Sequence, residues 1–251
     1  MTLTADLTGK RALVTGASTG FGAHFAQVLA TAGATVILGA RRAVLLEKVA
    51  ESIMVAGGNV EILSLDVSSR ASVERAAAAA GRVDILINNA GVGNGKPLLE
   101  QSEEDWDWIL NTNLKGAWLV AMSVAKGMRA SGLGGSIINV ASILGLRQAG
   151  HVTPYAISKS ALIQLTKQFA LELARFKIRC NAIAPGYFAT DLNREFFLTD
   201  AGKALIARMP QRRLGQLEDL DGPLLLLASD SSRYMTGSVL IVDGGHLVSS
   251  L

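Results

Sequence analysis

The sequence lacks features that several protein classes require. A single cysteine, Cys180, cannot form a disulfide within the chain, which suits a reducing cytoplasm. The 24 basic and 21 acidic residues leave a net charge of only +3 and form no long basic run, so we expect neither a nucleic-acid nor a membrane partner. The longest apolar stretches, such as 224–228, fall far short of the ~18 residues that cross a bilayer, and no signal peptide is visible.

The chain does contain a regular alternation of short apolar runs and longer amphipathic ones. Hydrophobic residues make up 49% of the 251 residues, enough for one well-packed domain over residues 1–251. We expect strands at 11–15, 35–39, 60–64, 84–88, 135–140, 178–184 and 239–242. We expect helices at 20–32, 42–56, 69–80, 102–130, 154–176 and 218–228. This alternation predicts an α/β fold in which a seven-stranded parallel sheet has helices on both faces.

The first strand leads into a helix through a glycine-rich turn. Its sequence is Thr15-Gly16-Ala17-Ser18-Thr19-Gly20-Phe21-Gly22. Glycines allow a tight turn and close approach to a ligand, and a helix N-terminus offers N–H groups to a pyrophosphate. The turn therefore indicates a dinucleotide site formed by Gly16, Ser18, Thr19, Gly20, Phe21 and Gly22, with a purely structural turn as the alternative.

The second strand ends without the carboxylate that would bind a ribose 2′-hydroxyl. Arg41 and Arg42 stand there instead, and a guanidinium pairs well with a phosphate. We therefore expect NADP(H) in preference to NAD(H). The alternative is that both arginines are solvated residues at a helix start, and Thr19 adds no positive charge in the glycine turn.

Tyr155 and Lys159 stand four residues apart on a predicted helix, which places both side chains on one face. Lowering a tyrosine pKa from ~10 by ~2–3 units requires roughly 3–4 kcal/mol of preferential phenolate stabilisation. An ammonium ~4 Å away supplies about 4 kcal/mol at an effective dielectric constant of ~20, before desolvation costs. The pair can therefore serve proton transfer, although such spacing also arises by chance.

Two more polar residues are candidates for the same site. Ser142 follows the fifth strand, at the end where parallel sheets bind ligands, and its hydroxyl could bind an oxygen shared with Tyr155. Asn113 is a poor helix former in mid-helix, where it could hold a water, open the helix locally or simply be exposed. His151 could line the substrate cleft. No spaced His/Cys/carboxylate cluster is present, so we expect no metal.

These motifs resemble the short-chain dehydrogenase/reductase family, in its short single-domain branch, over essentially the whole chain. T-G-x-x-x-G-x-G is present at 15–22 and N-N-A-G at 88–91, and the serine and tyrosine stand thirteen residues apart, as is usual there. The family's P-G-x-x-x-T, its adenine-contacting pair and its D-G-G are matched by Pro185-Gly186 with Thr190, by Asp66-Val67 and by Asp243-Gly244-Gly245. The resemblance implies a Rossmann-type doubly wound fold. It adds to the cofactor-binding residues Asp66, Val67, Asn89, Ala90, Gly91, Tyr155, Lys159, Pro185, Gly186 and Thr190.

The resemblance also implies catalytic roles for four residues in hydride exchange between nicotinamide and a carbonyl or alcohol carbon. Tyr155 would give its proton to the carbonyl oxygen in reduction, and its phenolate would be the base in oxidation. Lys159 would lower the tyrosine pKa and hold the nicotinamide ribose. Ser142 would orient the substrate oxygen, and Asn113 would support a water relay that restores the proton.

We therefore expect an NADP(H)-dependent oxidoreductase that reduces a ketone or a β-keto acyl compound. An NAD-dependent alcohol or sugar-alcohol dehydrogenase is the main alternative. A non-catalytic NADP(H)-sensing protein is disfavoured because both Tyr155 and Lys159 are present. An epimerase or dehydratase of the longer branch is disfavoured by the glycine spacing and the chain length.

Residues 191–213 follow the nicotinamide-contacting stretch, and in this family such a segment is a mobile lid over the substrate. An apolar cover could come from Tyr187, Leu192, Phe196, Phe197 and Met209. Such a cover suits a ketone, an acyl thioester or a cyclic alcohol more than a highly charged sugar.

Relatives pair their long helices across a two-fold axis. We therefore expect the predicted helices 102–130 and 154–176 to support a homotetramer. One departure from the family is Lys177, which stands before the sixth strand where many relatives have glycine, so the shape of that turn stays open.

Overall fold

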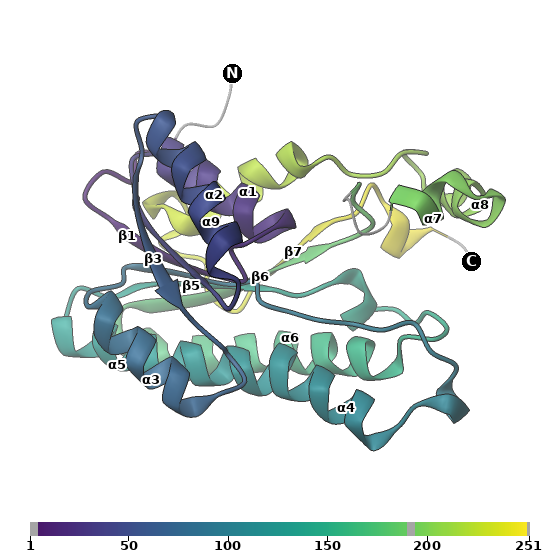
Figure 1. Cartoon of the computed structure of the whole chain (residues 1–251), viewed down its shortest axis with the longest axis horizontal. Coiled ribbons are helices and arrows are strands. Elements are labelled where there is room, and N and C mark those ends of the chain that lie inside the picture. The colour runs from purple at the N-terminus through teal and green to yellow at the C-terminus, as the bar shows by residue number, and fades with distance from the viewer. Residues whose placement is uncertain (1–4, 190–193, 250–251) are drawn as a thin grey trace.

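Seven parallel strands form one sheet in the computed structural model, which describes residues 5–189 and 194–249 (Figure 1). The strands are β1 (Arg11–Thr15), β2 (Thr35–Ala40), β3 (Asn59–Ser64), β4 (Ile85–Asn88), β5 (Gly135–Val140), β6 (Ile178–Pro185) and β7 (Val239–Val242). They lie side by side in the order β3-β2-β1-β4-β5-β6-β7, so the direction of progression reverses between β1 and β4. The predicted doubly wound α/β fold is confirmed.

Helices cover both faces of the sheet (Figure 1). They are α1 (Gly20–Thr31), α2 (Ala43–Val55), α3 (Arg70–Ala80), α4 (Glu103–Leu110), α5 (Ala117–Ser131), α6 (Thr153–Leu173), α7 (Arg194–Leu198), α8 (Asp200–Arg208) and α9 (Asp221–Ala228). One apolar core lies between the sheet and α1, α2 and α9, and a second lies between the sheet and α3, α5 and α6. Val14 belongs to the first core and its neighbour Leu13 to the second. Because both faces of the central strands are buried, the sequences of β1, β2 and β4 are almost continuously apolar, whereas the edge strand β3 is largely exposed.

None of the helices in the described part of the chain is both long enough and apolar enough to cross a membrane.

The predicted helix 102–130 is not one regular helix. The chain forms α4, then a π-helix over Asn111–Gly116, and then α5. The side chain of Asn113 bonds to both backbone polar groups of Val92, at 2.7 and 2.8 Å. Gly116 lies so close to Val67 that an added Cβ would come within 2.8 Å of its Cγ2. The wider turn thus brings Asn113 against the loop after β4, and a local opening of the helix was one of the three alternatives that the sequence left for this residue.

The turn before β6 uses a residue in the left-handed conformation. Lys177 has a φ of 61° and a ψ of 24°, which glycine would adopt without strain. Its N–H closes the turn on the carbonyl of Ala174 at 2.9 Å, while its side chain stays exposed. Gly134 packs on this turn so closely that a Cβ there would come 2.3 Å from the Lys177 oxygen. Lysine therefore adopts here the left-handed conformation that glycine favours, at some cost in backbone strain.

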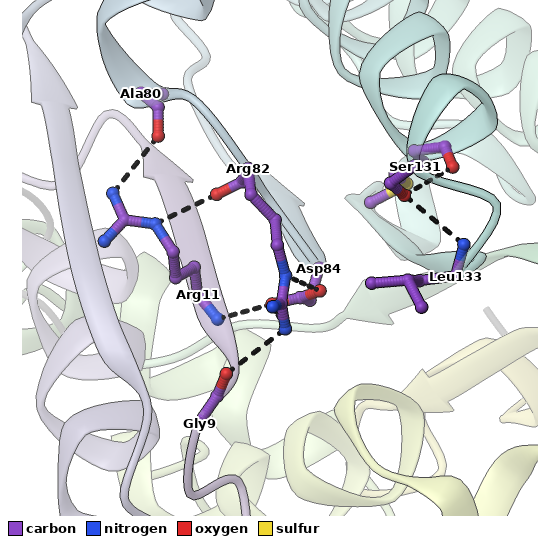
Figure 2. A network of polar contacts seen from close by, with 8 residues as sticks. Gly9, Arg11, Ala80, Arg82, Asp84, Ser131 and Leu133 are labelled. Atoms are coloured by element: carbon purple, nitrogen blue, oxygen red, sulfur yellow. Dashed lines mark hydrogen bonds and ion pairs between the residues drawn. The ribbon is translucent and has the colours of Figure 1, made fainter.

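The amino ends of β1 and β4 are joined by a polar network (Figure 2). Asp84 is only 8% exposed and accepts hydrogen bonds from the Arg11 N–H at 2.8 Å and from the Arg82 guanidinium at 2.8 and 3.0 Å. The Arg11 guanidinium donates to the carbonyls of Ala80 and Arg82 and forms a two-point pair with Glu61 on β3, at 2.7 and 2.8 Å. The network links strands that are distant in sequence and helps to fix their relative positions.

We predict that Asp84→Ala lowers the free energy of unfolding by about 2 kcal/mol, because it leaves the Arg11 N–H without an acceptor at a buried position. Arg82→Ala is the matched control. It should cost less than about 1 kcal/mol, since the Arg82 side chain is 48% exposed and its pair is screened by water. Urea unfolding followed by circular dichroism measures both values. Equal decreases in the free energy of unfolding for the two variants would contradict the role of Asp84 as the acceptor of the Arg11 backbone N–H.

Candidate active site

The predicted site residues follow the carboxyl ends of the strands, at the edge of the sheet opposite the Asp84 network. The glycine turn follows β1, Arg41 follows β2, and Asn89 follows β4. Ser142 follows β5, and Gly186 follows β6. Because all strands are parallel, these segments lie along one edge, where doubly wound sheets bind their ligands.

The glycine turn has the shape that its sequence predicts. Gly16 and Gly20 have φ values of 66° and 56°, which favour glycine. A Cβ on Gly22 would come 2.3 Å from the Gly16 oxygen, so α1 can approach β1 this closely only with glycine there. A Cβ on Gly20 would meet nothing within 4 Å, which leaves open space over the start of the helix.

The loop after β4 holds the glycine turn in place. The side-chain amide of Asn89 donates to the carbonyls of Thr15 at 2.9 Å and Gly16 at 3.2 Å. The Thr15 hydroxyl in turn accepts from the N–H groups of Asn89 and Ala90, both at 3.0 Å. Asn89 stays a predicted cofactor contact, and its amide nitrogen also connects two loops. Sequence spacing could not distinguish these roles.

Positive charge lies beside the glycine turn. The guanidinium of Arg42 donates to the hydroxyls of Ser18 at 2.9 Å and Thr19 at 3.2 Å. Thr19 makes no side-chain cap on α1, which leaves the first N–H groups of that helix open to a ligand. Arg41 is exposed, and its charge helps to lower the pKa of Asp66, although a hydrogen bond from Ser68 is the larger cause. An uncapped helix start with an adjacent guanidinium fits the diphosphate of a dinucleotide.

The two residues of the predicted adenine-contacting pair, Asp66 and Val67, have different surroundings. Asp66 accepts hydrogen bonds from the N–H and the hydroxyl of Ser68, at 3.0 and 2.6 Å, and stays partly exposed. The Val67 side chain is buried against Gly116. Only its backbone can therefore face a ligand. Thr190 lies outside the described residues.

The four predicted catalytic residues come from three separate segments and meet next to Gly91. A Cβ on Gly91 would lie 3.4 Å from Asn113 Oδ1 and 3.5 Å from Lys159 Nζ. Lys159 is 4% exposed, and its Nζ donates to the Val140 carbonyl at 2.8 Å. The same Nζ lies 5.6 Å from the centroid of the Tyr155 ring. Ser142 is close enough to form a hydrogen bond with Tyr155.

Burial shifts both members of the tyrosine–lysine pair toward their neutral forms. It raises the pKa of Tyr155, against the effect of the Ser142 hydrogen bond, and it lowers the pKa of Lys159 to about 8. The family resemblance implied a lowered tyrosine pKa, and in this chain the direction is the reverse because desolvation dominates. Near pH 7, Tyr155 is therefore a neutral phenol and Lys159 is mainly an ammonium.

Sequence analysis missed the role of Ser158. Its hydroxyl donates to the Tyr155 carbonyl at 2.7 Å and accepts from the Asn113 amide at 3.0 Å. Ser158 is fully buried and so joins the π-helix to α6 directly beneath the reactive side chains. A serine three residues after the tyrosine was a possible signal, because i and i+3 share a helix face.

Part of the predicted lid is helical, in α7 and α8. Phe197 and Met209 are buried, at 7% and 2% exposure, whereas Phe196 and Leu198 are exposed, at 47% and 69%. The Phe197 ring packs edge-on against Tyr187, with centroids 5.9 Å apart. Leu192 lies outside the described residues. Phe197 and Met209 are thus packed inward, while Phe196 faces solvent.

The histidines have three different surroundings. His24 pairs with Asp221 at 2.6 Å. His151 has a φ of 67°, and its carbonyl accepts from the Lys96 N–H at 2.8 Å, which connects the loops before α6 and after β4. His246 is 7% exposed, and its ring lies 5.5 Å from that of Tyr187. Within residues 5–189 and 194–249, no three metal-ligating side chains gather.

A cavity of about 350 Å³ lies between the ends of β6 and β7 and the segment after α8. Its lining includes Tyr187, Gln211, Arg213 and Asp243 but none of the four predicted catalytic residues. The cavity is therefore separate from the place where the four predicted catalytic residues gather.

Comparison with known proteins agrees with this geometry. A family model described as Enoyl-(Acyl carrier protein) reductase matches residues 16–246. The chain is 39% identical to the 2-dehydro-3-deoxy-D-gluconate 5-dehydrogenase of Dickeya dadantii, over 97% of this chain and 98% of that protein. It is 38% identical to the 3-oxoacyl-[acyl-carrier-protein] reductase of Thermotoga maritima, over 96% and 99%.

A solved structure is similarly close. The gluconate 5-dehydrogenase of Burkholderia cenocepacia, crystallised with NADP and tartrate, superposes with a TM-score of 0.93 at 36% identity and covers 98% of each chain. Sequence identity at this level over nearly the full length, together with the glycine turn and the Ser142–Tyr155–Lys159 arrangement, identifies the family of the chain. The chain belongs to the short-chain dehydrogenase/reductase family, whose members are NAD(P)-dependent oxidoreductases acting on CH–OH and C=O groups.

Proposed function

We propose that the protein exchanges a hydride between NADP(H) and a ketone or secondary alcohol, with Tyr155 as the proton donor or acceptor. The observation that carries the proposal is the position of the Lys159 ammonium, buried 5.6 Å from the centroid of the Tyr155 ring, with Ser142 on the same phenol. A hydroxyl pair of this kind can hold one substrate oxygen between two donors.

The geometry of the site indicates which residues would hold each part of the dinucleotide. The open N–H groups at the start of α1 would bind the diphosphate, and Arg41 and Arg42 would bind a 2′-phosphate. The loop after β4 and Lys159 would flank the nicotinamide ribose, near Gly91. Bound there, the cofactor supplies or accepts the hydride.

In reduction, the neutral phenol of Tyr155 donates its proton to the substrate oxygen, and Ser142 keeps that oxygen in place. The raised pKa of Tyr155 suits this direction, because it keeps the proton on the phenol near pH 7. The Lys159 ammonium then stabilises the phenolate that forms. In oxidation, the same ammonium must first favour loss of the phenol proton, against the cost of burial.

Asn113 has a positioning role in this scheme. Both hydrogens of its amide are donated, to Val92 and Ser158, and its oxygen accepts from the Val92 N–H. Any water relay that restores the Tyr155 proton would therefore depend on the position Asn113 gives to its neighbours.

The substrate class is open between a simple ketone, a β-keto acyl compound and a polyhydroxy acid. The relatives named above act on both of the last two. An NAD-dependent sugar-alcohol dehydrogenase remains the second candidate. We also continue to predict a homotetramer, supported by tryptophans that are 36–45% exposed on α4 and α5, namely Trp106, Trp108 and Trp118.

We predict that Tyr155→Phe lowers kcat/KM for NADPH-dependent ketone reduction by roughly 10²–10⁴-fold, because the phenol is the only proton donor the proposal assigns. NADPH binding, followed by fluorescence, should be retained. Tyr234→Phe is the matched control, since Tyr234 is fully exposed. Equal turnover by wild type and Tyr155→Phe over a panel of ketones and β-keto thioesters would remove the catalytic assignment.

The lowered pKa of Lys159, about 8, predicts the pH dependence of reduction. The ammonium form is lost as pH rises through that value, so kcat/KM should fall above about pH 8. A stopped-flow or steady-state profile from pH 6 to 10, at constant ionic strength, measures this. A profile that stays level to pH 10 would show that the charge on Lys159 is not required.

Removing either arginine after β2 should reduce the preference for NADPH over NADH. We expect Arg41→Ala and Arg42→Ala each to lower the ratio of kcat/KM for the two cofactors by roughly tenfold or more, since a charge-assisted bond contributes ~1.5–3 kcal/mol. Activity with NADH should change little. Arg233→Ala, an exposed arginine after α9, is the control. If both variants kept the full wild-type ratio, the 2′-phosphate contact would be excluded.

A further inference from the structure

The ring of Tyr155 lies beside a glycine of the loop after β4. A Cβ on Gly93 would lie 3.0 Å from Cδ2 of Tyr155, 3.6 Å from Cγ and 3.7 Å from Cε2. Beyond the neighbours of Gly93 in the chain, these ring carbons are the three nearest atoms that such a side chain would meet. Tyr155 is only partly buried, so the core does not enclose its ring. The backbone of Gly93 is therefore a direct neighbour of the proposed proton donor.

The loop that contains Gly93 is bonded to other elements on both sides of it. Both backbone polar groups of Val92 bond to the side chain of Asn113, at 2.7 and 2.8 Å. The side-chain amide of Asn94 donates to the carboxylate of Asp105, in α4, at 2.8 Å. Because the residues before and after Gly93 are both held in this way, the loop resists moving away from the ring.

The helix that carries Tyr155 is held as well. The Asn113 amide donates to Ser158 Oγ at 3.0 Å, and the Ser158 hydroxyl donates to the Tyr155 carbonyl at 2.7 Å. The turn after β5 packs closely on α6, since a Cβ on Gly145 would come within 2.8 Å of the carbonyl carbon of Lys159. With the loop and the helix both fixed, the freedom left to the phenol is rotation about its side-chain bonds.

We infer that Gly93 is a positioning residue for proton transfer: because it has no side chain, the loop after β4 lies against the Tyr155 ring and limits the rotation of the phenol. This inference deepens the proposed function and rests on it, because it requires the Tyr155 hydroxyl to meet the substrate oxygen. The Lys159 ammonium, 5.6 Å from the ring centroid, marks the position that the ring has to keep. The rate of an oriented proton transfer falls steeply when the donor is misplaced by a fraction of an ångström.

Backbone conformation does not require glycine at this position. The φ of Gly93 lies outside the positive range, so an alanine there meets no left-handed strain. The same is true of Gly95, two residues further along the loop, where a Cβ would meet nothing within 4 Å. Gly95→Ala is therefore the matched control, because it adds the same methyl group to the same loop without touching the phenol.

Single-turnover reduction of the ketone panel by the NADPH-loaded protein measures the effect without a contribution from product release. Gly93→Ala should lower the rate at saturating ketone by about three- to tenfold, because the ring has to give way by a few tenths of an ångström. The half-saturating ketone concentration should change by less than about twofold. NADPH binding and the melting temperature should stay at their wild-type values, and Gly95→Ala should match wild type throughout.

Three results would overturn the inference. A higher half-saturating concentration at an unchanged rate would show that the methyl group obstructs the substrate. Weaker NADPH binding in Gly93→Ala alone would place the effect at the cofactor. A lower melting temperature in Gly93→Ala alone would place it in folding.

A double substitution tests whether Gly93 acts through the phenol. In the Tyr155→Phe background, Gly93→Ala should lower the remaining rate by less than about twofold, since no phenol proton is left to misplace. A decrease as large as the one in the wild-type background would show that Gly93 acts on another group, and would overturn the inference.

Failure of this inference differs from failure of the proposed function. If Tyr155→Phe is inactive and Gly93→Ala reacts like wild type, the positioning role is overturned and the proposed function stands. If Tyr155→Phe reacts as fast as wild type, or wild type reduces no ketone, the proposed function fails. The crystal structure of Gly93→Ala then decides whether Gly93 positions the ring: a ring displaced by a few tenths of an ångström supports it, and an unmoved ring beside a displaced loop overturns it.

Discussion

The site depends on one interaction that costs free energy, which is the burial of the Lys159 ammonium against the backbone carbonyl of Val140. Taking an ammonium out of water is costly, and the lowered pKa of Lys159 expresses that cost. The Val140 carbonyl and the face of the Tyr155 ring offset part of it. A cation held in this way needs no reorganisation when negative charge develops on the neighbouring phenol. The contacts of Ser158 and Asn113 fix the helix that carries it.

The sheet edge provides the second requirement, which is close approach between backbone segments. The glycine turn after β1 lies against the loop after β4, and Asn89 joins the two through their backbone groups. The strand order reverses at these two strands, so the edge opens between diverging loops there. Gly186 is similarly constrained, since a Cβ would come within 2.7 Å of Asp243. Gly16, Gly22 and Gly186 thus each correspond to a close contact that a side chain would block.

The sequence predicted the sheet, its parallel strands and the residues that gather at its edge, because periodicity and motif order depend on local chemistry. It did not predict the π-helix at Asn111–Gly116, whose widened turn results from contacts with Val67 and Val92 that are distant in the chain. It also did not predict that the Asn89 amide joins two loops, since spacing says where a side chain stands but not which partner it bonds. The direction of the Tyr155 pKa shift depends on burial, which sequence patterns do not supply.

The segment after β6 shows that residue type alone does not say which side chains pack inward. The aromatic residues of the lid predicted an apolar cover, yet Phe196 faces solvent while its neighbour Phe197 packs on Tyr187. Arg147, in the turn after Ser142, and Arg208, at the end of α8, lie outside every motif of the sequence. Which of these side chains can meet a substrate therefore depends on tertiary packing, which neither residue type nor motif order supplies.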